Sequence, residues 1–194
     1  MLVANLLVLI VVVKTGQLVA PTGMDALARQ WRDFLPAGIG VVFAGVVNGL
    51  IDSNTKARLV FWRWKHPLPG CFAFSRYLNR DPRIDVKALR KALGRLPTKP
   101  EAQNALWYRL YKSVEHEPGV VDAHRHYLLT RDYTAIAFLL LVTAAPLGAW
   151  LIGTRGTAAA YTGVLAAQYL LARQAAWHYG VRLVSTVLAL KAAT

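Results

Sequence analysis

Apolar residues gather toward both ends of the chain, and polar residues gather in its middle. Phe34 to Ile51 is a run of eighteen residues without a charge, and Thr134 to Ile152 is a second run of nineteen. About twenty helical residues cross the roughly 30 Å hydrocarbon core of a bilayer. We therefore predict one membrane-spanning helix in each run, and we expect Pro146 to kink the second.

Two further apolar segments are shorter. Thr157 to Ala172 is uncharged for sixteen residues and reaches membrane length by continuing past Arg173. Leu2 to Val13 is apolar for twelve residues, and an extension through Ala20 spans the membrane if Lys14 snorkels to the interface. A signal peptide that is removed is the alternative for residues 1–20. The chain has no positive residues before this run and no clear cleavage site after it, so we expect a retained helix.

Together these segments predict an all-α integral membrane protein with about four transmembrane helices, arranged as two hairpins around a helical cytoplasmic domain. The expected parts are an N-terminal hairpin over 1–51, a basic helical domain over 52–132, and a C-terminal hairpin with a cytoplasmic tail over 133–194. Composition agrees, since 55% of residues are hydrophobic and 17% are charged, against about 45–50% and 25% in typical soluble domains.

The charge is strongly basic, with 23 Lys and Arg against 10 Asp and Glu and a formal net charge of +13. Most of these charges lie in the middle segment. Because Lys and Arg beside membrane spans mark the cytoplasmic side, we expect the middle domain and both termini to be cytoplasmic, with the protein in a cell inner membrane. The lipid bilayer is then its first partner.

No common enzyme signature is present. The single Cys71 excludes an internal disulfide, and the chain has no GxxxxGK[ST], GxGxxG, HExxH or GxSxG sequence. His124 and His126 would point about 200° apart on a helix, which argues against a shared metal ion. We predict no catalytic residue, metal or cofactor. An enzyme would need converging polar groups near the bilayer, and the candidates are Asn48, His66, Arg131, Asp132 and Gln168.

Aromatic and basic residues alternate over residues 61–66, which follow the apolar run Phe34 to Ile51. Trp62 and Trp64 fit the headgroup level of a membrane, where Arg63 and Lys65 would meet anionic phosphates. The same residue types stack on nucleic-acid bases. Their position beside a membrane span favours lipid, and we expect no nucleic-acid partner.

Three helices are predicted in the middle domain. Asp85 begins an amphipathic helix whose cations form either a solvated face or a site for anionic headgroups or an anionic ligand. Thr98 to Glu101 has the pattern of a capping box before the second helix, and the third begins near Val120 and continues without a break into the third span. The cations of the first helix are Lys87, Arg90, Lys91 and Arg95.

Small residues in the spans predict close helix packing or a pore between copies. Gly45 and Gly49 form a GxxxG step, and Gly163 lies in a stripe of small residues. Asn48 and Gln168 would either line a polar path or form packing hydrogen bonds. We therefore expect a homo-oligomer.

Three stretches resemble a family of small multi-pass bacterial membrane proteins of unknown function. They are DPRID at 81–85, QNALWYRLYK at 103–112 and AHRHYLLTRDY at 123–133. The organisation is also similar to that of membrane effectors of antiphage defence. This similarity implies an oligomeric membrane protein that acts as a ligand-gated channel or a membrane-permeabilising effector with a cytoplasmic sensing domain. The alternative is a non-catalytic adaptor or scaffold that recruits a cytoplasmic protein.

Overall fold

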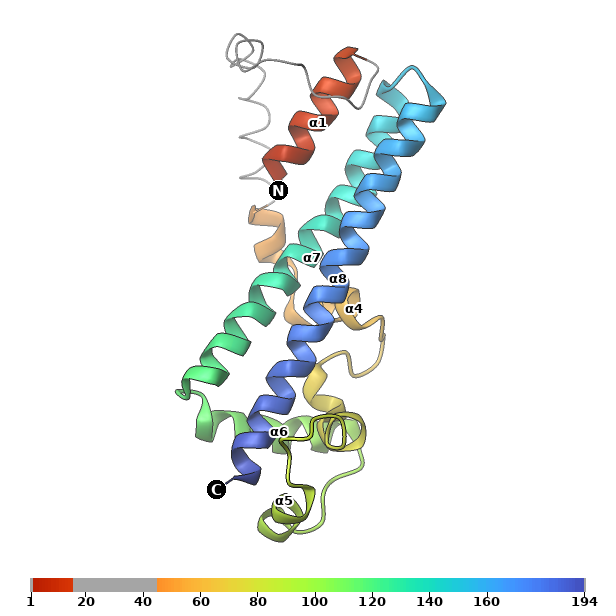
Figure 1. Cartoon of the computed structure of the whole chain (residues 1–194). Helices are drawn as coiled ribbons and strands as arrows, with labels where there is room; N and C mark the ends of the chain where they lie inside the picture. Colours follow the sequence, from red (N-terminus) through yellow and green to blue (C-terminus); the bar gives the residue numbers. More distant parts are fainter. Residues whose placement is uncertain (1, 16–44, 194) are drawn as a thin grey trace. The chain divides into compact units, whose positions relative to one another are not determined.

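The structure is a computed structural model that describes residues 2–15 and 45–193. All regular elements in these two ranges are helical (Figure 1). The helices are α1 (Leu2–Thr15), α4 (Ser53–Phe61), the 3₁₀-helix η1 (Pro69–Phe72), the π-helix η2 (Ala73–Tyr77), α5 (Val86–Leu93), α6 (Pro100–Val114), α7 (Pro118–Leu151) and α8 (Arg155–Ala192). Residues 45–50 are also helical.

The chain divides into two compact units. Unit 1 contains Met1–Asp52 and Ala135–Leu171, and unit 2 contains Ser53–Thr134 and Ala172–Thr194. The long helices α7 and α8 each contribute one part to each unit. Residues 172–194 therefore lie in the same compact unit as residues 53–134.

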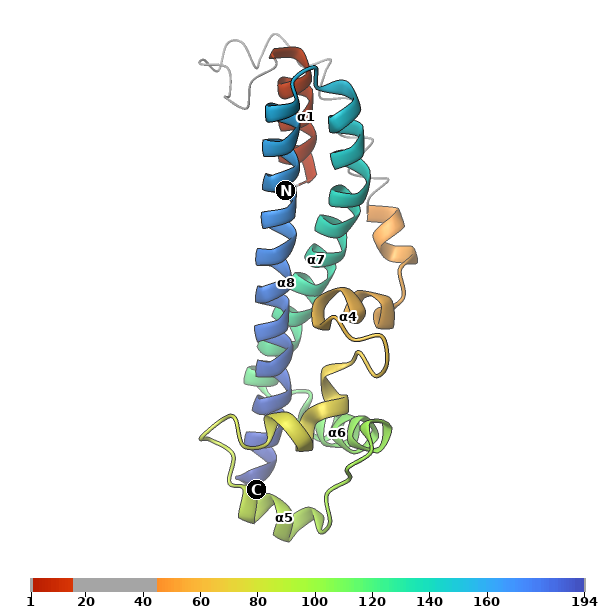
Figure 2. The same ribbon diagram turned by 90° about the vertical axis from the view of Figure 1, so that its right-hand side faces the viewer.

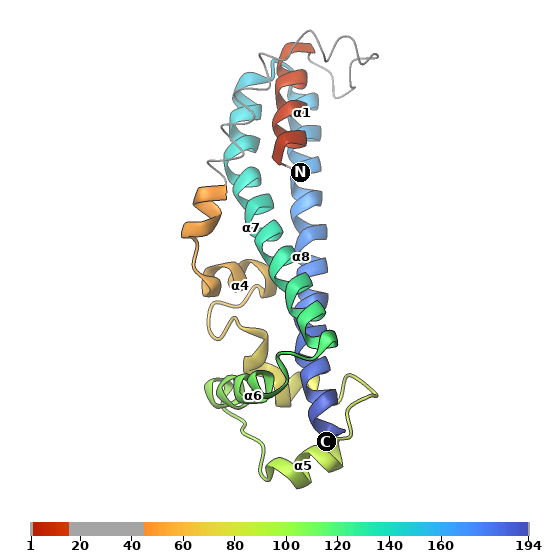
Figure 3. The same cartoon turned by 90° about the vertical axis from the view of Figure 1, so that its left-hand side faces the viewer.

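In unit 1, α1 lies against α7 and α8 (Figure 3). Leu9 and Val12 of α1 are buried against Leu140 of α7 and Leu165 of α8. The helices α7 and α8 form a hairpin, and α7 continues through Pro146. Close packing depends on Gly148, because a Cβ atom there would lie 2.9 Å from the Tyr161 ring. A glycine thus allows the two backbones to approach, as is common between membrane helices.

In unit 2, aromatic side chains supply much of the core. Phe61, Phe74, Tyr77, Trp107 and Tyr127 are buried together with aliphatic residues of α8. Helix α6 runs across α8 in Figure 1 and is seen end-on in Figure 2. This crossing lets residues of α6 contact both the segment that precedes it and the long helices.

Gln103 connects α6 to the preceding segment of unit 2. Its side-chain oxygen accepts hydrogen bonds from the backbone nitrogens of Phe74 at 3.0 Å and Ser75 at 3.1 Å. Its amide nitrogen donates to the Thr98 carbonyl at 2.9 Å. Since Gln103 is buried, this one side chain satisfies backbone groups that would otherwise lack partners away from water.

Helix boundaries correct two details of the prediction. Asp85 caps α5 as expected, because its side chain accepts from the backbone nitrogens of Lys87 and Ala88. However, α5 ends at Leu93, since Gly94 adopts a φ of 71° that glycine takes at little cost. Arg95 therefore lies beyond the helix on which it was predicted.

The capping box at Thr98 is also wrong. Helix α6 has Lys99 at its N-cap, with no side-chain cap bond and with Pro100 at its first position. The following helix α7 begins at Pro118 rather than near Val120, because proline fits the first turn of a helix. From there α7 is continuous to Leu151, which confirms the predicted unbroken helix into the apolar run that begins at Thr134.

One described helix, α7, is long and apolar enough to cross a membrane, judged by length and composition. The four predicted spans are therefore not supported. Helix α1 has 14 residues, or about 21 Å, and residues 16–20 that would extend it lie outside the described residues. Residues 34–44 of the second predicted span also lie outside them. Helix α8 does not reach the same hydropathy, since Gln168, Arg173 and Gln174 interrupt its apolar run.

Candidate functional site

The loop after α4 presents the predicted aromatic and basic residues in different ways. Trp62 and Trp64 are exposed, with 59% and 85% of their surface accessible, whereas Arg63 is half-buried over the Phe72 ring at 4.1 Å. Lys65 is exposed. Two indoles and one ammonium group are therefore exposed to solvent, and Arg63 is held by an aromatic ring of its own unit.

Contacts on either side fix this loop. The Arg173 guanidinium of α8 lies 3.8 Å from the centre of the Trp62 ring. His66 Nδ1 lies 3.2 Å from a carboxylate oxygen of Glu101 in α6. Trp62 and His66 have φ angles of 50° and 51°, in the left-handed region that side chains other than glycine rarely adopt. The loop conformation thus depends on its contacts with α6 and α8.

The basic face of α5 is solvent-facing. Lys87 is exposed, as are Arg90 and Lys91, while Leu89 is fully buried against the core of unit 2. This is the arrangement that the amphipathic pattern predicts. It leaves three helical cations available for a partner.

The predicted packing glycines have open space around them. A Cβ atom at Gly45, Gly49 or Gly163 would meet nothing within 4 Å among the described residues. Asn48 has a buried side-chain oxygen without a hydrogen-bond partner in this part of the chain. Their role between copies stays a prediction.

Gln168 pairs within unit 1. Its side-chain oxygen accepts a hydrogen bond of 2.8 Å from the Asn5 amide of α1. The alternative of a packing hydrogen bond is therefore present in the structure. Asn5 is a partner that sequence reasoning missed, although an amide in the first apolar segment was a usable signal.

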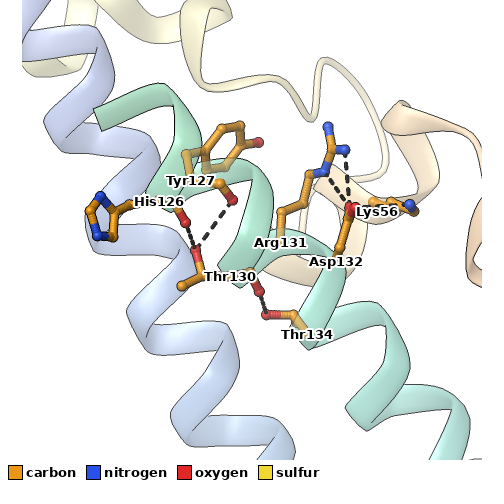
Figure 4. Close-up of polar contacts among 7 residues, drawn as sticks. All are labelled: Lys56, His126, Tyr127, Thr130, Arg131, Asp132 and Thr134. Atoms are coloured by element: carbon orange, nitrogen blue, oxygen red, sulfur yellow. Dashed lines mark hydrogen bonds and ion pairs between the residues drawn. The ribbon is translucent and has the colours of Figure 1, made fainter. Parts of the chain in front are cut away.

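A charged cluster lies where α7 changes from polar to apolar residues (Figure 4). Asp132 accepts from Arg131 at 3.0 Å and pairs with the Lys56 ammonium of α4 at 3.1 Å. Lys56 is buried, with 6% of its surface accessible. One carboxylate therefore serves two cations, and the cluster has an excess positive charge. Arg131 and Asp132, which the sequence offered as candidate polar groups near the bilayer, form an ion pair, and Lys56 is a third member that sequence reasoning missed.

The histidines of α7 have separate partners. His124 Nδ1 lies 3.0 Å from the Tyr111 hydroxyl, and burial, with a smaller contribution from Arg131, lowers its pKa. His126 stacks on Tyr179 with ring centres 5.1 Å apart and points toward α8 (Figure 4). Over the described ranges, no three His, Cys, Asp or Glu side chains gather in a way that could hold a metal ion.

A basic cleft of about 360 Å³ lies between the segment after η2 and the C-terminal part of α8. Arg80 lies 5.2 Å from the Trp177 ring centre, and Arg83 forms a bidentate pair with Asp81. That pair lowers the pKa of the Asp81 carboxyl. Arg182 completes the cationic lining, so three arginines face one acid. Sequence reasoning missed this cleft because its two sides are about one hundred residues apart.

Comparison with known proteins gives no family assignment. No family model matches the chain, no curated protein matches it, and no solved structure resembles it.

Proposed function

We propose that the chain is an integral membrane protein in which the apolar parts of α7 and α8 form a transmembrane hairpin and unit 2 binds an anionic partner outside the hydrocarbon. The observation that most directly supports a transmembrane hairpin is the apolar surface of α7 and α8 between Tyr133 and Ala172. Between Tyr133 and Ala172 the only charged residue is Arg155, at the turn. The large exposed side chains are nevertheless apolar and include Val142, Trp150, Val164 and Leu171.

Charge placement supports this topology. Arg155 lies at one end of the hairpin. At the other end, Arg131 and Asp132 immediately precede the apolar part of α7. A charge at the bilayer centre costs about 2.5–3.5 kcal/mol, so charges at the two ends define the part that lipid can surround. The excess of Lys and Arg in unit 2 favours the cytoplasmic side for that unit.

Cysteine labelling tests the hairpin directly. The native Cys71 is buried, and burial raises the pKa of its thiol, so the unsubstituted chain serves as the unreactive control. In sealed vesicles of known orientation, Arg155→Cys and Glu117→Cys should react with a membrane-impermeant maleimide from opposite sides. Glu117→Cys should react from the cytoplasmic side. Labelling of both from one side, or release of the chain by alkaline carbonate, would contradict the hairpin.

The basic face of α5 favours an anionic membrane surface as one partner of unit 2. Each of the three cations, Lys87, Arg90 and Lys91, contributes on the order of 1 kcal/mol to the free energy of binding near anionic lipid. Replacing all three by Glu should reduce binding to phosphatidylglycerol vesicles and leave folding unchanged, because Leu89 stays buried. Unchanged vesicle binding with loss of a captured protein would favour the adaptor function instead.

The second part of the proposal is that several copies of the chain assemble in the membrane. A channel or permeabilising effector needs it, because two helices from one chain enclose no pore. Among the described residues, the faces at Gly45, Gly49 and Gly163 have space for a neighbouring helix. Native mass spectrometry should give a defined oligomer that Gly163→Leu disrupts. A monomer without conductance in liposomes would contradict assembly and leave the hairpin untouched.

A further inference from the structure

A second cavity in unit 2 is separate from the basic cleft. It measures about 300 Å³ and is lined by the segment Leu68–Gly70 and by residues of α6, α7 and α8. The two cavities share no lining residue. Its volume lies at the lower end of the range for small-molecule pockets, so it suits a ligand of one or two rings.

Aromatic side chains form much of the cavity wall. Trp107 stacks on Tyr111 with ring centres 5.7 Å apart, and His124 meets Tyr111 edge-on at 5.4 Å. Tyr127 lines the same cavity from α7. Flat aromatic walls contact a planar aromatic ligand with favourable ring–ring geometry.

Two of these lining residues have buried polar atoms without partners. Neither the indole nitrogen of Trp107 nor the Tyr127 hydroxyl has a hydrogen-bond partner in the described part of the chain. Trp107 and Tyr127 are 8% and 6% exposed. Buried polar groups in native proteins are nearly always paired, so these two donors are candidates to pair with a hydrogen-bond acceptor of a bound molecule.

The charge near the cavity is positive. Arg131 lines it, with its side chain 14% exposed, and shares Asp132 with Lys56. Lys112, also in the lining, is paired with Glu115 at 2.6 Å. Burial lowers the pKa of His124, so its imidazole adds no charge at neutral pH. Arg131 is therefore the group with attraction left for an anion.

We propose that this cavity binds a small aromatic carboxylic acid, whose ring lies against Trp107 and Tyr111 and whose carboxylate meets Arg131. This ligand class satisfies the aromatic walls, the unpaired donors and the excess positive charge together. The inference names a ligand for unit 2 and does not depend on the transmembrane hairpin.

Calorimetric titration of the full chain in zwitterionic nanodiscs, or in buffer if the chain is water-soluble, tests the proposal. The probes are 2-naphthoate and its neutral isostere 2-naphthamide. We expect saturable binding of 2-naphthoate to one site and at least about tenfold weaker binding of 2-naphthamide, the loss that follows from removing a charge-assisted hydrogen bond. Because the titration reads binding alone, its result is distinct from that of the cysteine labelling.

Variants locate the binding. Arg131→Gln should weaken 2-naphthoate binding about tenfold and leave 2-naphthamide unchanged. Arg125→Gln, an exposed residue of α7 outside the cavity, is the charge-matched control and should have no effect. Tyr127→Phe removes one hydroxyl and should weaken both probes several-fold. If Arg131→Gln loses its helical circular dichroism, Tyr127→Phe decides alone.

Several outcomes overturn the proposal. They are absence of saturable binding, equal affinity for the two probes, and unchanged affinity in Tyr127→Phe. Loss of binding in Arg80→Gln rather than Arg131→Gln would place the anion in the basic cleft and would equally refute the aromatic cavity.

Discussion

The two parts of α7 expose similar aliphatic residues in different surroundings. In unit 2, the exposed Val121 is followed by charged residues such as Asp122 and Arg125. In unit 1, the exposed Val142 lies in a stretch from Tyr133 to Thr154 that has no charge. Exposed aliphatic residues are common on any protein, so exposure alone does not identify the solvent. The two parts of α7 therefore differ in their charge and not in the exposure of their aliphatic residues.

A matched pair of arginines on α7 tests whether its two parts have different surroundings. Val142→Arg places a charge near the middle of the apolar run and should cost about 3 kcal/mol of insertion free energy, or roughly a hundredfold in the inserted fraction. Val121→Arg, at a site of similar exposure, 50% against 47%, should insert normally. The carbonate-resistant fraction of each variant measures the difference. Equal insertion of both would show that the apolar part of α7 is not surrounded by lipid.

Gln103→Ala tests the buried hydrogen bonds in the core of unit 2. The change leaves the backbone nitrogens of Phe74 and Ser75 without acceptors. We expect a loss of about 2 kcal/mol in the free energy of unfolding of unit 2. Gln174→Ala is the control, because Gln174 is exposed and bonds only to His178 among the described residues. Denaturant unfolding followed by circular dichroism should separate the two, and equal midpoints would contradict the role of Gln103.

The charged cluster at the change in α7 should respond unequally to removal of its members. Asp132→Asn leaves the buried Lys56 without a carboxylate and should destabilise unit 2 by about 1–2 kcal/mol, a value reduced by the partial exposure of Asp132. Lys56→Met should be nearly neutral, because Arg131 still pairs with Asp132. Thermal unfolding checks the order of the two variants. A larger loss in Lys56→Met would mean that Lys56, not Asp132, organises the cluster.

The smallest predicted effect is a pH dependence. Since burial lowers the pKa of folded His124 from its ordinary value of 6.5, the unfolded chain takes up this proton at a higher pH than the folded chain. Stability should therefore be complete above about pH 6.5 and should fall as the pH drops through that value toward the lowered folded pKa. His124→Gln should flatten this part of the unfolding profile. A wild-type profile that rises on acidification would contradict the sign.

Local sequence signals predicted where the helices lie better than they predicted which residues are in contact. Asp85 marked the start of α5 because a cap acts on nitrogens two and three residues away. The charge-free run after Asp132 likewise indicated the apolar part of α7. The capping pattern did not predict the pairing of the Thr98 carbonyl with Gln103. In the structure the Gln103 side-chain amide donates to this carbonyl, and α6 has no side-chain cap.

Long-range sites were beyond the sequence for a physical reason. The basic cleft joins Arg80 to Arg182, and the charged cluster joins Lys56 to Asp132. Neither pair has a periodicity or spacing that reveals it, because its two members are far apart in the sequence and lie on different segments. The predicted ligand residues were accordingly in two local patterns, Arg63 and Lys65 after α4 and the cations on and just beyond α5, and the cavities formed by several helices were missed.

The left-handed backbone at Trp62 and His66 has a consequence for protein design. Each such residue costs on the order of 1 kcal/mol that glycine would not pay. A designer who sought only thermal stability would therefore place glycine at both positions. The chain instead gives up folding free energy to present an indole and an imidazole from one short loop, so this loop is where gains in stability and retention of the natural surface would conflict.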